Sequence, residues 1–182
     1  TGDFYEKSDL DLLILINDDR GYQLARAFIQ DDLQVGHDIY CTTWESLQKD
    51  ALYEHPNISK LMDSRIVYCA DEKYRQELEK LRKQVWDKLA APLEKEDYEK
   101  AEHLLANAEH CYTRAMIAES RSEVLSWAGG VIYYIENAIA MLNKKYFRYG
   151  VKRAYEELSA MKDRPEKLCE LIDNIVLASS VS

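Results

Sequence analysis

Two aspartates, Asp9 and Asp11, lie at the start of an apolar run in the segment SDLDLLILI. An apolar strand edge is an unfavourable place for charge, and two neighbouring carboxylates repel each other more strongly where little water is present. Residues two apart on a strand project from the same face. Because a cation between the two carboxylates would remove their repulsion, this pair predicts a metal site.

A third aspartate, Asp38, lies in the next predicted strand, within VGHDIY. If this strand pairs with the first, three carboxylates can converge. Such hard oxygen ligands suit Mg²⁺, which takes its remaining ligands from water and substrate phosphates. Two such ions can hold the attacking and leaving oxygens of a phosphoryl transfer. D-x-D alone is a weak motif in a chain with 33 acidic residues, so solvated or capping aspartates are the alternative.

The elements that must position these acids are expected in the first 70 residues. The continuous apolar run 10–16 predicts a strand covered on both faces. The segment 17–32 predicts a helix with Asn17 or Asp18 as its N-cap. Its apolar face would consist of Leu24, Ala25, Phe28 and Ile29. The other predicted elements are a strand over 33–44, helices over 42–51 and 55–64, and a strand over 65–69.

From residue 71 the apolar pattern becomes helical, with steps of three and four residues. Helices are predicted over 71–91, where Pro92 ends the first one, and then over 97–118, 122–145, 151–161 and from 165 onward. The predicted fold class is therefore α+β, a small mixed-sheet domain followed by an all-α helical bundle. The expected division is 1–70 for the α/β core, 71–94 for a connecting helix and 95–182 for the bundle.

Composition limits the classes of function. The chain has 182 residues and a net charge of -9, which argues against broad nucleic-acid binding because that needs a basic surface. Its four cysteines are far apart without metal-ligand spacing, and reduced thiols fit a cytoplasmic protein. No apolar run approaches the length of a membrane span. The sequence is also compatible with a homodimer.

The segment TGDFYEKSDLDLLILI, followed by VGHDIY, resembles the nucleotidyltransferase superfamily typified by DNA polymerase beta and the antibiotic nucleotidyltransferases. The resemblance implies that Asp9, Asp11 and Asp38 are the metal ligands, and that Gly2 and Ser8 shape the turn beside a nucleoside triphosphate. The family's Gly-Ser pair should precede this segment and is not in the sequence, so an upstream piece is expected to be missing.

The helical half is similar, more loosely, to the bundle attached to antibiotic nucleotidyltransferases. That likeness implies a bundle carboxylate as general base on an acceptor hydroxyl, and Glu109 is the first choice. The alternatives are Glu102, Glu119, Glu123 and Glu136, or Asp38 acting as both ligand and base. Lys144 and Lys145 are expected to contact the phosphates, within a basic cluster that also contains Arg148, Lys152 and Arg153.

The resemblance therefore implies an enzyme that uses Mg²⁺ and an NTP, ATP first, to transfer an NMP to a hydroxyl of a small molecule such as an aminoglycoside or lincosamide. Two alternative functions are compatible with the same residues. One is a toxin–antitoxin nucleotidyltransferase that modifies a protein partner. The other is a non-catalytic nucleotide-binding module with the same fold. Neither nucleic acid nor a membrane is expected as a partner.

Overall fold

The computed structural model describes residues 9–30, 32, 34–150 and 153–178. The chain divides into two compact units. One comprises Thr1–Tyr53 and Ile58–Asp87, and the other comprises Glu54–Asn57 and Lys88–Ser182. Each unit is described by itself below.

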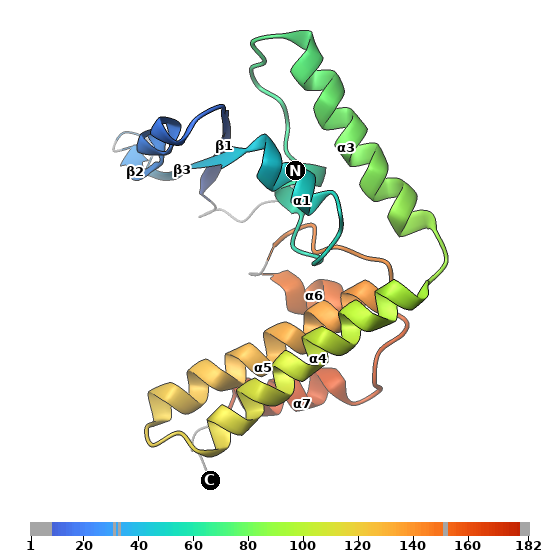
Figure 1. The fold of residues 1–182 in the computed structure, drawn as a ribbon. Coiled ribbons are helices and arrows are strands. Elements are labelled where there is room, and N and C mark those ends of the chain that lie inside the picture. Colours follow the sequence, from blue (N-terminus) through green and yellow to red (C-terminus); the bar gives the residue numbers. More distant parts are fainter. Residues whose placement is uncertain (1–8, 31, 33, 151–152, 179–182) are drawn as a thin grey trace. The chain divides into compact units, whose positions relative to one another are not determined.

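The first unit contains a three-stranded sheet formed by β1 (Leu10–Ile16), β2 (Arg26–Gln30) and β3 (Val35–Thr43). The strand order is β1-β3-β2, so β3 is central (Figure 1). β1 runs parallel to β3, whereas β2 runs antiparallel to it. The sheet is therefore mixed, as predicted, and the strands expected over 10–16 and 33–44 are confirmed. β1 is half-buried or exposed up to Leu15 rather than covered on both faces.

The helix predicted over 17–32 is wrong. Asp18 caps a 3₁₀ helix, η1 (Asp19–Leu24), by accepting a hydrogen bond from the Arg20 N–H at 2.8 Å. The chain then extends into β2, where Phe28 lies opposite His37 of β3 and their ring centroids are 4.8 Å apart. The backbone pairing with β3 thus outweighs the helical spacing of the apolar residues.

Three helices complete the first unit. Thr43 begins α1 (Trp44–Asp50) by accepting a hydrogen bond from the Ser46 N–H at 3.2 Å. α2 (Ser59–Met62) and α3 (Glu72–Ala90) follow. The buried apolar side chains of these helices are Leu47, Leu61, Met62, Leu78, Leu81 and Val85.

The strand predicted over 65–69 is also wrong, because these residues adopt irregular structure. Val67 and Tyr68 are largely exposed, so the β-branched and aromatic residues here have no sheet to pack on. The chain just before this segment is held by Arg82 of α3. Its guanidinium donates to the carbonyls of Leu61 at 2.8 Å and Ser64 at 2.5 Å.

The second unit is helical. Its long helices are α4 (Lys95–Met116) and α5 (Arg121–Leu142), and each begins with a reciprocal capping box. α4 and α5 pack closely at Gly130, where an added Cβ would lie 2.8 Å from the Cys111 sulfur. α5 is buried all round from Glu136 to Met141. These helices begin and end within three residues of their predicted bounds.

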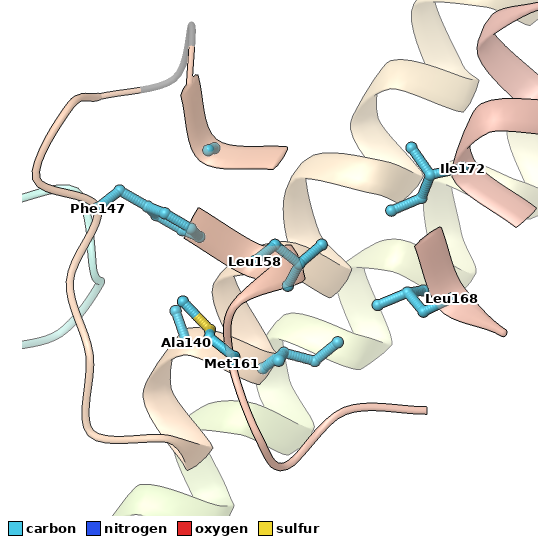
Figure 2. Packing of buried hydrophobic residues seen from close by; sticks show 8 residues of the cluster. Ala140, Phe147, Leu158, Met161, Leu168 and Ile172 are labelled. Atoms are coloured by element: carbon cyan, nitrogen blue, oxygen red, sulfur yellow. The ribbon is translucent and has the colours of Figure 1, made fainter. Parts of the chain in front are cut away.

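Two short helices, α6 (Ala154–Ser159) and α7 (Leu168–Val176), close the core of the second unit. Figure 2 shows the labelled side chains Ala140, Phe147, Leu158, Met161, Leu168 and Ile172, which belong to one buried cluster. Phe147 is 1% exposed, and its backbone N–H donates to the Pro56 carbonyl at 3.0 Å. Among the described helices of the whole chain, none combines the length and apolar character needed to cross a bilayer.

Candidate functional site

The register of the sheet places two of the predicted ligands side by side. Asp11 of β1 and Asp38 of β3 are partners in the parallel pairing. Residues paired in this way project from the same face of the sheet. The central step of the sequence prediction, that the strands bearing Asp11 and Asp38 pair, is therefore observed.

Asp9 reaches the same face just before β1 begins. A Cβ added to Gly36 would lie 2.2 Å from the Asp9 Oδ1 atom. Gly36 is two residues before Asp38 on β3, so the position where its side chain would project is on the Asp38 face. The Asp9 carboxylate therefore occupies the place of a side chain next to Asp38.

Tyr40 lies on the sheet face that carries Asp9, Asp11 and Asp38, called the acidic face below, although it was not among the predicted site residues. Its hydroxyl donates to the Asp38 Oδ2 atom at 3.3 Å. Burial raises the pKa of Tyr40, and the negative charges of Asp11 and Asp38 raise it further because they disfavour a phenolate beside them. Tyr40 follows Asp38 by two residues, so strand alternation was the signal that could have identified it.

His37 takes no part in this face. Its Nδ1 atom lies 3.0 Å from the Val35 carbonyl oxygen, and its ring stacks on Phe28 of β2. This is the packed role expected of a residue next to Asp38 in a strand.

The donor set is suited to Mg²⁺ in kind, since it consists of carboxylate oxygens on one exposed sheet face. In the part of the chain that the structure describes, no three His, Cys, Asp or Glu side chains gather closely enough to form a metal site by themselves. Mg²⁺ normally takes only one or two carboxylates and completes its shell with water and phosphate oxygens. The set of Asp9, Asp11 and Asp38 thus stays a prediction, and Gly2 and Ser8 lie outside the described residues.

The bundle carboxylates differ sharply in their surroundings. Glu109 and Glu102 are exposed on α4. Glu119 is exposed in the connection between α4 and α5. Glu123 accepts the Ser120 backbone N–H at 3.2 Å in the capping box of α5, which gives it a structural role. Glu136 is only 8% exposed, and this burial raises its pKa to about 7.

Lys144 is held by a carboxylate of its own unit. Its ammonium donates to the Asp97 Oδ2 atom at 2.5 Å, and both side chains are mostly buried. Burial raises the pKa of Asp97, but hydrogen bonds from Lys144 and the Glu94 N–H outweigh it, so the pKa lies below its usual value. This ion pair ties the segment after α5 to the first turn of α4.

The rest of the predicted basic cluster lies in the same segment. Lys145 is exposed, and its backbone N–H donates to the Ala140 carbonyl at 2.9 Å. The Arg153 guanidinium lies 4.2 Å from the Tyr149 ring centroid and donates to Glu156 at 2.8 Å. Lys152 lies outside the described residues.

No known protein family, curated protein or solved structure matches this chain. The case for a function therefore rests on the residues of the acidic face.

Proposed function

We propose that the protein is a Mg²⁺-dependent nucleotidyltransferase that moves an NMP from an NTP to a hydroxyl group of a small molecule. The observation that supports it best is the register pairing of Asp11 with Asp38, with Asp9 seated against Gly36 on the same face. If Asp9 and Asp11 were a D-x-D pair that occurs by chance, there would be no reason for a third aspartate at the position of β3 that pairs with Asp11.

The roles of the residues follow from their chemistry. Asp9, Asp11 and Asp38 would hold Mg²⁺, which when bound offsets phosphate charge and orients the triphosphate. In the reaction, the acceptor oxygen bonds to the α-phosphorus. The bond between the α-phosphorus and the oxygen that bridges it to the β-phosphorus breaks, and pyrophosphate leaves with that oxygen. The acceptor proton needs a base, for which Asp38 and a bundle carboxylate are the candidates.

Glu136 was an alternative to Glu109 from the sequence, and it is the bundle carboxylate whose pKa burial raises to about 7. Glu109, the first choice from the sequence, is exposed. Comparing E136Q with E109Q in the same transfer assay separates the two candidates, because only the base should lower kcat while leaving triphosphate affinity intact.

The acceptor class is proposed from the resemblance and the charge. A net charge of -9 attracts cationic molecules, and aminoglycosides are polyhydroxylated cations. Lincosamides are the second class to be tested.

The deciding experiment incubates the purified protein with Mg²⁺, each of the four common NTPs, and a panel of aminoglycosides and lincosamides. Release of pyrophosphate that depends on the acceptor is the expected result, with loss of at least about a hundredfold in D11N or D38N because each removes a ligand. Asp19→Asn, an exposed aspartate of η1, is the matched control. Tight Mg-ATP binding without transfer to any acceptor would contradict the proposal and favour the non-catalytic module.

A further inference from the structure

Lys60 lies beside the acidic face, although nothing in the sequence singled it out. It belongs to α2, and its ammonium nitrogen is 5.1 Å from the centroid of the Tyr40 ring. The hydroxyl of that ring is hydrogen-bonded to Asp38. Tyr40 therefore links a cation at the face of its ring to the carboxylates at its hydroxyl end.

Lys60 carries a charge that no described residue neutralises. Across residues 9–30, 32, 34–150 and 153–178, no carboxylate forms an ion pair with it, and its side chain is exposed. By contrast, Lys49 pairs with Glu45 at 2.8 Å. A cation–π contact fixes the position of an ammonium group while leaving its N–H donors open to a ligand.

Lys60 contacts the ring of Tyr40, whereas Asp38 accepts a hydrogen bond from the hydroxyl of the same residue. A lysine paired with that carboxylate would compete with a divalent cation for it. Because Lys60 contacts the ring instead, the carboxylates stay available to a metal ion and the ammonium stays available to an anion. This arrangement fits a ligand that brings its own cation, such as a magnesium polyphosphate.

We propose that Lys60 binds a phosphate group of the triphosphate that reaches Asp11 and Asp38 as its magnesium complex. The inference rests on the proposed function and extends it, because it assigns the phosphate contact to the same unit as the acids. The acids alone repel a polyphosphate, and a compact ammonium charge beside them offsets that repulsion. Lys144 is less suited, because leaving Asp97 would strand a mostly buried carboxylate.

The test measures binding of inorganic tripolyphosphate in the presence of Mg²⁺ by titration calorimetry. Lys60→Gln should weaken binding about tenfold, which corresponds to one charge-assisted hydrogen bond. Lys60→Arg should recover most of the affinity. Lys49→Gln, an equal change of charge on α1, should bind like the wild type, because its exposed pair with Glu45 contributes little.

A second measurement separates this inference from the proposed function. Binding of Mn²⁺ alone, followed by electron paramagnetic resonance, should be no weaker in Lys60→Gln than in the wild type. If the wild-type protein binds neither Mn²⁺ nor magnesium tripolyphosphate, the proposed function and this inference both fall. If it binds both, but Lys60→Gln binds tripolyphosphate as the wild type does or Lys49→Gln shows the same loss, only the assignment of Lys60 falls.

Discussion

Gly36 leaves a space in β3 that the carboxylate of Asp9 fills. Any larger residue at this position would project from the face that carries Asp38, directly into the Asp9 Oδ1 atom. Asp9 precedes the strand and is not fixed by the ladder, so its position depends on this space. The geometry of the acidic face is thus controlled by a residue that has no functional group.

Gly36→Ala should therefore weaken Mn²⁺ binding, by about tenfold if Asp9 supplies one of the ligands. The fold should persist, because the added Cβ meets the end of a side chain and alanine in a strand costs no more than glycine. Electron paramagnetic resonance of Mn²⁺ measures the affinity, and urea unfolding measures stability. The control is Gly129→Ala, where nothing lies within 4 Å of the added Cβ. Unchanged Mn²⁺ affinity in Gly36→Ala would remove Asp9 from the site.

Glu136 should make stability depend on pH. Its pKa rises from 4.5 in the unfolded chain to about 7 in the folded one, so between these values the folded state holds the extra proton. The free energy of unfolding therefore falls as pH rises from 4.5 to 7, by about 3 kcal/mol at most. Glu136→Gln should remove this fall and be more stable than the wild type at pH 8, as urea unfolding at several pH values can measure. Glu109→Gln, at an exposed site, should keep the wild-type profile.

Residue-level prediction from the sequence reached as far as local patterns allow. Asp11 and Asp38 could be selected because each interrupts an apolar run. Tyr40 could also have been selected, because it follows Asp38 by two residues on the same strand. Lys60 could not, because its position beside the Tyr40 ring depends on where α2 packs, which no local pattern encodes. Glu136 and Glu109 both lie on predicted helices, and burial in the folded unit is what distinguishes them.

At the scale of elements, the errors occurred where non-local pairing decides the structure. In β2, four of five residues are exposed, so there was no alternation of buried and exposed positions to reveal a strand. Residues 65–69 have strand-like composition, but no neighbouring strand pairs with them among the described residues. The long helices were predictable because apolar residues spaced by three and four positions are a local signal.

The ion pair between the segment after α5 and the start of α4 should matter more for stability than for ligands. Lys144→Met leaves the Asp97 carboxylate without its cation, and the expected cost is about 3 kcal/mol of unfolding free energy. Lys95→Met, which breaks the exposed pair with Glu99, should cost about 0.5 kcal/mol or less. Urea unfolding compares the two. A stable Lys144→Met protein with weakened tripolyphosphate binding would instead give Lys144 the phosphate role predicted from the sequence.

At the scale of the whole molecule, the change from an alternating to a helical pattern predicts two kinds of unit. It does not predict which residues belong to each unit. Residues 54–57 belong to the helical unit although both flanking segments belong to the other. Glu54 pairs with Lys100 at 3.0 Å, and Asn57 donates to the Asn137 side chain at 2.6 Å. These partners lie far along the sequence, so the assignment of residues 54–57 to the helical unit could not be predicted from it.

The paired acids should also leave a signature in the stability of the entire chain. Asp11 and Asp38 are like charges at matching positions of neighbouring strands, an arrangement that destabilises a sheet in the absence of a cation. In EDTA, Asp11→Asn should therefore be more stable than the wild type, by about 0.5 kcal/mol. Mg²⁺ at a hundred times its Kd should stabilise the wild type by about 2.7 kcal/mol, because it binds only the folded state. The variant should gain far less, so the order of stability should reverse when Mg²⁺ replaces EDTA.

Thermal unfolding in the two buffers measures this reversal without any assay of activity. Asp19→Asn removes the same charge from η1 and should show the wild-type response to Mg²⁺. If Asp11→Asn is stabilised by Mg²⁺ as much as the wild type, the carboxylates on this face do not hold the ion. The like-charge pair would then be an unfavourable contact without a ligand to compensate it, and the proposed reaction would lose its metal site.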